Sequence, residues 1–185
     1  MLPQCLLAPP YAGLTLWLLP LPAGSRQQHK QHLHHWLQHN LPRLLGGQVE
    51  LQFCAGNAAQ LRLDSLTLPL SLAYAGNAAL VAINQRSSHN IGVDLVWQAD
   101  SGDDALSVAK EFFPEAIVGN LARQAASTRQ ACFSQQWARL EAALKAAQLT
   151  LADAAQLTPA QWQRAVPLQG LPPGYAAAVA LSGQC

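Results

Sequence analysis

The chain contains 185 residues, half of them hydrophobic and 11% of them charged, and its formal net charge is +1. Because a chain of this length and hydrophobicity can bury a substantial core, the composition excludes an intrinsically disordered protein. The nearly neutral charge argues against a general nucleic-acid-binding protein, which would carry a strong positive charge.

The N-terminal segment and the cysteines bear on the compartment. The first 24 residues are apolar, but they lack a basic start and are interrupted by five prolines, which is unlike a signal peptide or a membrane span. The four cysteines are widely spaced and show no metal-type pairing. We therefore expect free thiols, a cytoplasmic location and no association with a membrane. The cysteines are Cys5, Cys54, Cys132 and Cys185.

The first half of the chain predicts a strand, a helix and a group of further strands. An uninterrupted apolar run at 14–19 is typical of a buried strand. Ser25 is a suitable N-cap for a helix at 26–38, whose apolar stripe contains Leu33 and Leu37. Further strands are expected at 48–54, 61–63, 66–72 and 77–83, with the last two paired around a turn at 74–76.

The helix predicted after Ser25 is rich in histidine, and its segment carries five of the six histidines of the chain. His35 and His39 are four residues apart, a spacing that can hold zinc. No acid or cysteine lies near them in the sequence, so we favour a polar helix face over a metal site.

The second half predicts several helices and a final strand. Ser101 or Asp103 can cap a helix that begins near Asp104 and ends before Pro114, because proline disfavours a helical conformation in the preceding residue. The remaining expected elements are a short helix at 115–123, a connection at 125–129, a strand or turn at 149–151, a helical turn from 158 and a strand at 175–181.

The most regular pattern in the chain lies at 133–147. Phe133, Trp137, Leu140 and Leu144 recur at steps of three and four residues, which predicts a helix with one apolar stripe and with Trp137 as a core residue. On the same helix Glu141 lies beside the stripe, with Lys145 four residues later. The simplest interpretation of that spacing is a solvated ion pair between these two side chains.

Asp94 suggests a different interpretation, because it lies within an apolar segment, 91–96, that predicts a strand. A lone aspartate in such a strand is costly to bury unless it is paired or bound to a metal. Asp94 and Glu141 could converge on a divalent cation. Magnesium accepts two carboxylates and completes its coordination shell with water and phosphate oxygens.

Five stretches together resemble the 4'-phosphopantetheinyl transferase superfamily, in its surfactin-type branch. The family's helix motif has Phe, Trp, Lys-Glu-Ala and Lys at the spacing found here for Phe133, Trp137, Leu140-Glu141-Ala142 and Lys145, and its strand motif of Gly, aliphatic residue and Asp matches Gly92-Val93-Asp94. The other similar stretches are 68–73, 111–115 and 174–180.

The resemblance implies an α+β fold of two similar halves related by a pseudo-twofold axis, each a small sheet packed with helices, here 1–86 and 87–185. It implies transfer of the phosphopantetheine arm of coenzyme A to a serine of an acyl or peptidyl carrier protein, as in fatty acid or polyketide biosynthesis. The implied metal ligands for Mg²⁺ are Asp94 and Glu141. Glu141 would also accept the serine proton, and Lys145 would meet the leaving phosphate.

The implied contacts to coenzyme A are Arg26, Lys30, Ser71 and Lys145. Several positions depart from the family pattern: Asn57, Leu72, Ala73, Val96 and Leu140 stand where the family has polar, basic or acidic residues. We therefore expect weak binding of coenzyme A by a monomeric enzyme. The alternative is a catalytically impaired relative that binds a carrier protein or another partner through the same surface.

Overall fold

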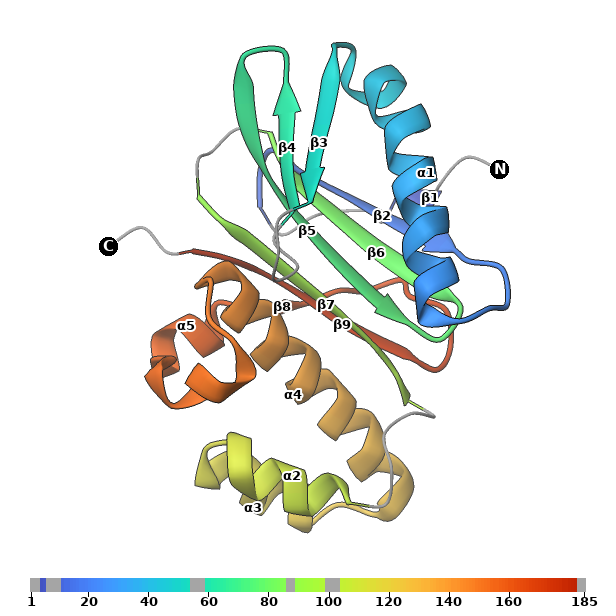
Figure 1. The fold of residues 1–185 in the computed structure, drawn as a ribbon. Coiled ribbons are helices and arrows are strands. Elements are labelled where there is room, and N and C mark those ends of the chain that lie inside the picture. The colour runs from blue at the N-terminus through green and yellow to red at the C-terminus, as the bar shows by residue number, and fades with distance from the viewer. Residues whose placement is uncertain (1–3, 6–10, 54–58, 86–88, 99–103, 183–185) are drawn as a thin grey trace.

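The computed structural model describes residues 4–5, 11–53, 59–85, 89–98 and 104–182. They form a mixed α+β fold with two antiparallel sheets, and helices pack against both of them. Figure 1 shows the two sheets lying between helix α1 on one side and helix α4 on the other. The α+β class expected from the sequence is therefore confirmed.

The larger sheet has six strands in the order β1-β2-β6-β5-β4-β3. Its strand β6 is buried at all seven residues and lies between β2 and β5. Strands β5 and β6 form the expected hairpin, in which Gly76 adopts a φ of 50° that glycine tolerates without strain. The strands are β1 (Gln4–Cys5), β2 (Leu14–Pro20), β3 (Val49–Phe53), β4 (Ala59–Leu63), β5 (Leu66–Ala75) and β6 (Ala78–Asn84).

Helix α1 (Arg26–Leu45) covers one face of this sheet. Ser25 and Gln28 form a reciprocal capping box at its start. The helix is longer than the predicted 26–38, because Leu41 continues the buried stripe of Leu33 and Leu37 by another turn. It ends at Gly46, whose φ of 73° is the left-handed conformation common after a helix.

The smaller sheet has the order β7-β9-β8 and packs on the other face of the six-stranded sheet. Side chains of a strand alternate between its two faces. In β7 (Ile91–Trp97), Ile91, Val93 and Leu95 therefore enter the core between the sheets, while Asp94 faces helix α4. The other two strands are β8 (Val166–Pro167) and β9 (Tyr175–Leu181).

Helix α4 (Ala126–Ala146) lies across the smaller sheet and carries the predicted apolar stripe. Leu140 and Leu144 are fully buried, and Trp137 is partly buried in an aromatic cluster with Phe112 and Phe133. The connection predicted at 125–129 is wrong. That stretch contains neither glycine nor proline, so nothing in it prevents the helix from starting at Ala126.

The remaining helices enclose the aromatic cluster. The helix predicted from Asp104 and the one predicted after Pro114 are both present, and 149–151 opens a 3-10 helix, so the turn rather than the strand interpretation is correct there. Their bounds are α2 (Ala105–Phe112), α3 (Glu115–Ala122), 3-10 helix η2 (Leu151–Gln156) and α5 (Pro159–Gln163). Among the described residues, no helix combines the length and hydropathy needed to cross a bilayer.

Candidate functional site

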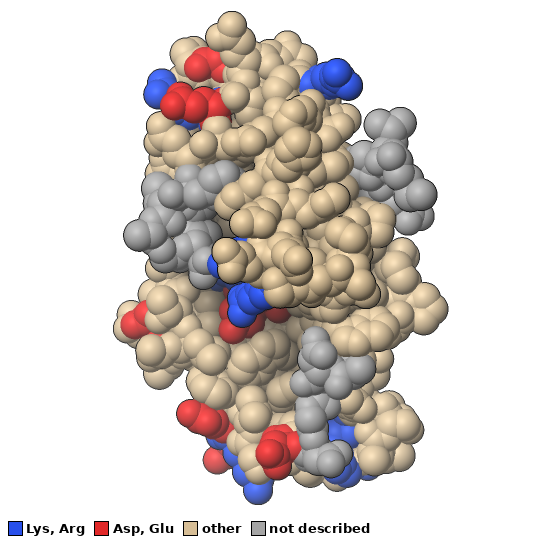
Figure 2. Space-filling model, turned by 45° about the vertical axis from the view of Figure 1, so that its right-hand side comes forward, with Lys and Arg blue, Asp and Glu red and all other residues tan. Residues whose placement is uncertain are grey.

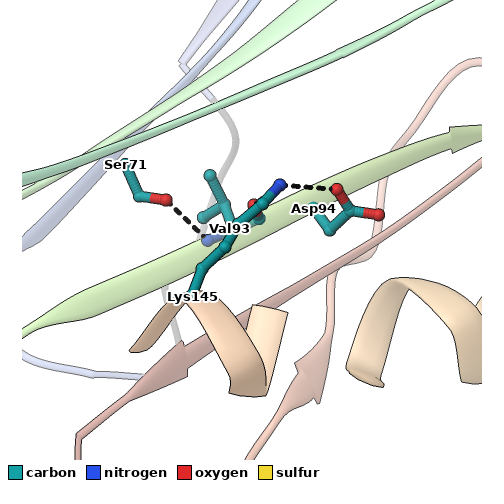
Figure 3. A network of polar contacts seen from close by, with 4 residues as sticks. All are labelled: Ser71, Val93, Asp94 and Lys145. Carbon is teal, nitrogen blue, oxygen red and sulfur yellow. Dashed lines mark hydrogen bonds and ion pairs between the residues drawn. The ribbon is translucent and has the colours of Figure 1, made fainter. Parts of the chain in front are cut away.

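Asp94 is held by the side chain of Lys145, as Figure 3 shows. Lys145 Nζ on α4 donates a hydrogen bond of 2.7 Å to Asp94 Oδ1 on β7 and another of 3.0 Å to the carbonyl oxygen of Val93. The Asp94 side chain is 13% exposed and that of Lys145 is 32% exposed. The lone aspartate therefore has a cationic partner, which compensates for its burial.

Ser71 on β5 completes the same network from the other sheet. The backbone N–H of Val93 donates to Ser71 Oγ over 3.0 Å, and the serine is 7% exposed. Both polar groups of the Val93 backbone are thus satisfied by side chains, Ser71 on one side and Lys145 on the other. The hydroxyl joins the two sheets. A contact of Ser71 with coenzyme A stays a prediction.

Gly92 explains how α4 comes close enough for Lys145 to reach β7. A Cβ atom at this position would overlap the carbonyl oxygen of Ala142 and the backbone nitrogen of Ala146. Strand and helix therefore touch backbone to backbone, which only glycine permits. The glycine two residues before Asp94 positions the ion pair in this way.

Glu141 lies on α4, one turn before Lys145, and the charges of Asp94 and Lys145 both act on its carboxyl group. Burial raises the pKa of the Glu141 carboxyl, the negative charge of Asp94 raises it further, and Lys145 lowers it. The pKa of Asp94 is raised by burial, against the lowering effects of Lys145 and a backbone hydrogen bond from Leu95. The charge of Asp94 on β7 therefore influences the carboxyl group of Glu141 on α4.

One face of the molecule has a hollow in which charges of both signs lie close together. In the view of Figure 2, acidic atoms lie in a hollow midway down the face, with basic atoms beside them, while much of the surrounding surface is uncharged. The charged groups of this hollow stand out in a chain of which only 11% is charged.

No group of three or more His, Cys, Asp or Glu side chains that could hold a metal occurs among the described residues. The candidate ligands for a metal are therefore the two carboxylates of Asp94 and Glu141, and Asp94 Oδ1 accepts a hydrogen bond from Lys145. Two carboxylates fit magnesium, which commonly takes one or two from a protein and fills its shell with water and substrate phosphates.

Arg26 and Lys30 are not brought to this pair. Both lie on α1, and the six-stranded sheet separates α1 from β7. Arg26 is near Tyr74. Burial raises the pKa of Tyr74 to about 12, and the positive charge of Arg26 acts in the opposite direction. The pKa of His34 is lowered by burial and then by Lys30. The contact of Arg26 and Lys30 with coenzyme A stays a prediction.

The histidine pair on α1 is engaged within its own helix. The rings of His35 and His39 have centroids 4.0 Å apart, and Nδ1 of His39 is 2.8 Å from the carbonyl oxygen of His35. One ring nitrogen of His39 is therefore used by the helix backbone. Of the cysteines, Cys132 is a free thiol, and the side chains of Cys5, Cys54 and Cys185 lie outside the described residues.

The ion pair of Lys145 with Asp94 was not predicted from the sequence, because the four-residue spacing indicated Glu141 as the partner of Lys145. The available signal was the aspartate in an apolar strand, which needs a cation, in a chain with three lysines. No protein-family model and no curated protein matches this chain.

Proposed function

We propose that this protein transfers the 4'-phosphopantetheine arm of coenzyme A to a serine of an acyl or peptidyl carrier protein, with magnesium as cofactor. The observation that carries the proposal is the ion pair between Asp94 on β7 and Lys145 on α4, with Glu141 one helical turn from that lysine. Burial raises the pKa of both carboxyl groups, and perturbed pKa values beside a specific charge partner are common at functional sites, which supports the proposal.

The three side chains have separate tasks in this reaction. When bound to Asp94 and Glu141, magnesium would supply a Lewis acid for the diphosphate of coenzyme A. Glu141 accepts the proton of the attacking serine, directly or through water. Lys145 neutralises the negative charge that develops on the leaving adenosine 3',5'-bisphosphate.

Coenzyme A should bind weakly. Leu72 packs with the core beneath α1, and Ala73 is buried between the sheets, so neither supplies a polar contact to a ligand. Each missing charge-assisted contact is worth about 1.5–3 kcal/mol of binding free energy. Loss of such ground-state contacts raises the Michaelis constant more than it lowers the rate at saturation.

A pseudo-twofold relation between the halves 1–86 and 87–185 is part of the same proposal. It is supported by one long helix in each half, α1 of 20 residues and α4 of 21 residues, each lying on a sheet of its own half. The halves differ in the number of described strands, six in the first and three in the second.

The alternative is a binding protein without catalysis. It is favoured by Leu140, which is fully buried where the resembling family has a lysine. Incubation of apo carrier proteins with the protein, coenzyme A and magnesium, followed by intact-mass measurement, tests the two functions. A carrier that gains one phosphopantetheine supports the transferase, and a carrier that binds without any gain supports the alternative.

A further inference from the structure

Lys145 and Asp94 differ in how freely each can move. Asp94 projects from strand β7 and is 13% exposed, so its carboxylate has little access to solvent. Lys145 is 32% exposed and reaches Asp94 with a flexible four-carbon stem. Its other contact is the neutral carbonyl oxygen of Val93. The ion pair can therefore open by movement of the lysine alone.

The charges of the site are not balanced by this lysine. Lys145 brings one positive charge to Asp94, while Glu141 adds a second carboxylate one helical turn away on α4. A divalent cation between the carboxylates would neutralise both of them. A divalent cation bound by Asp94 would also be close to the ammonium of Lys145, which donates to Asp94 Oδ1 over 2.7 Å. The two positive charges would repel each other.

We propose that Lys145 is the resident counter-ion of the metal position, and that a divalent cation displaces it from Asp94. The inference rests on the proposed function for the identity of the metal site. In the metal-free protein, Lys145 neutralises part of the charge of Asp94 and holds α4 on β7. Once displaced, the ammonium lies one helical turn from Glu141, free to donate to a phosphate oxygen. Phosphate capture by Lys145 thereby follows metal loading.

Acylation of lysines in the intact protein tests the displacement. The chain has three lysines, and Lys110 on the exposed face of α2 serves as an internal reference. The protein is treated with an N-hydroxysuccinimide ester of acetate, with and without saturating magnesium, and the modified peptides are quantified by mass spectrometry. We expect magnesium to increase acetylation of Lys145 severalfold relative to Lys110. An unchanged or lower ratio overturns the inference.

A second experiment measures the competition directly. Binding of Mn²⁺, counted by its paramagnetic resonance, is compared between the unaltered protein, Lys145→Met and the charge-matched control Lys110→Met. We expect Lys145→Met to bind Mn²⁺ roughly tenfold or more tightly, a factor set by the charge-assisted hydrogen bond that no longer competes, and Lys110→Met to bind like the unaltered protein. Equal or weaker binding by Lys145→Met, or no binding by any form, contradicts the inference.

The two proposals fail separately. Transfer of phosphopantetheine by a protein whose Lys145 acetylation ignores magnesium would leave the function standing and overturn the displacement. A magnesium-dependent rise in Lys145 acetylation without transfer to any carrier protein would keep the displacement and contradict the function. The acetylation experiment needs no variant, so it remains decisive even where Lys145→Met folds poorly.

Discussion

Lys145 and Asp94 are 51 residues apart in the chain, and their side chains meet at 2.7 Å between α4 and β7. The pair joins the two elements that carry the candidate site, and its members are not equally exposed. Removal of Lys145 should therefore cost more stability than removal of Asp94. Asp94 is the more buried of the two, so without its partner its charge has little contact with solvent.

We predict that Lys145→Met lowers the free energy of unfolding more than Asp94→Asn does. Lys145→Met leaves a buried carboxylate without its cation and should cost about 2–3 kcal/mol, a value at or below the usual range for a broken buried pair because the lysine is partly exposed. Asp94→Asn leaves a lysine that can turn to water and should cost less than about 1 kcal/mol. Urea denaturation at pH 7 compares the two, and equal losses would contradict the asymmetry.

We predict that Glu141→Gln stabilises the protein at neutral pH. Because the folded protein raises the pKa of Glu141, the native state holds this proton more tightly than the unfolded chain does, and stability is lost as the pH rises through the folded pKa. Because glutamine does not ionise, the Glu141→Gln variant does not lose this stability as the pH rises. The melting temperature of the variant should exceed that of the unaltered protein at pH 8, and the gap should shrink toward about pH 4, near the pKa of an unperturbed glutamate.

The matched control for this experiment is Glu115→Gln, at an exposed position of α3. Its melting temperature should stay within about 1–2 °C of the unaltered protein at every pH, as is usual for an exposed substitution. A stabilisation by Glu141→Gln that did not depend on pH would show that charge is not its cause.

We predict that Gly92→Ala is strongly destabilising. The added methyl group would overlap backbone atoms of α4, which cannot rotate away as a side chain can, so the helix and β7 must separate. Overpacking of a core typically costs about 1–3 kcal/mol, and a clash with backbone belongs at or above the upper end. The shift of a urea unfolding curve measures the loss.

Gly119→Ala on α3 is the control for that substitution. A Cβ atom there meets only the end of the Arg123 side chain at 3.7 Å, and alanine is a better helix former than glycine by about 1 kcal/mol. This variant should be as stable as the unaltered protein or more stable. Equal effects of the two substitutions would mean that the contact between β7 and α4 is not as close as described.

Local patterns in the sequence predicted helix α4 and the position of Asp94 in a strand. The stripe of Phe133, Leu140 and Leu144 predicted α4, and an acid in an apolar strand pointed to Asp94, because both signals act within a few residues. The partner of Lys145 was not predictable in the same way. Its pairing across 51 residues follows from the packing of α4 on β7, which spacing alone does not encode.

Local sequence patterns also could not predict the order in which the sheets and helices are layered. The sequence predicted a helix that begins at Arg26, but not that the six-stranded sheet would separate this helix from Asp94. Ser71 is a similar case. As a polar residue in a strand it was open to several interpretations, and only the position of the second sheet shows that its hydroxyl accepts the N–H of Val93.

The transfer reaction with matched variants tests the central claim most directly. Several apo carrier proteins are incubated with millimolar coenzyme A, magnesium and the unaltered protein, Glu141→Gln or Glu115→Gln, and intact masses are recorded after folding of each variant has been verified. The unaltered protein and Glu115→Gln should add one phosphopantetheine to at least one carrier, and Glu141→Gln should add none. Equal transfer by Glu141→Gln, or no transfer by the unaltered protein to any carrier, would contradict the assignment of this site.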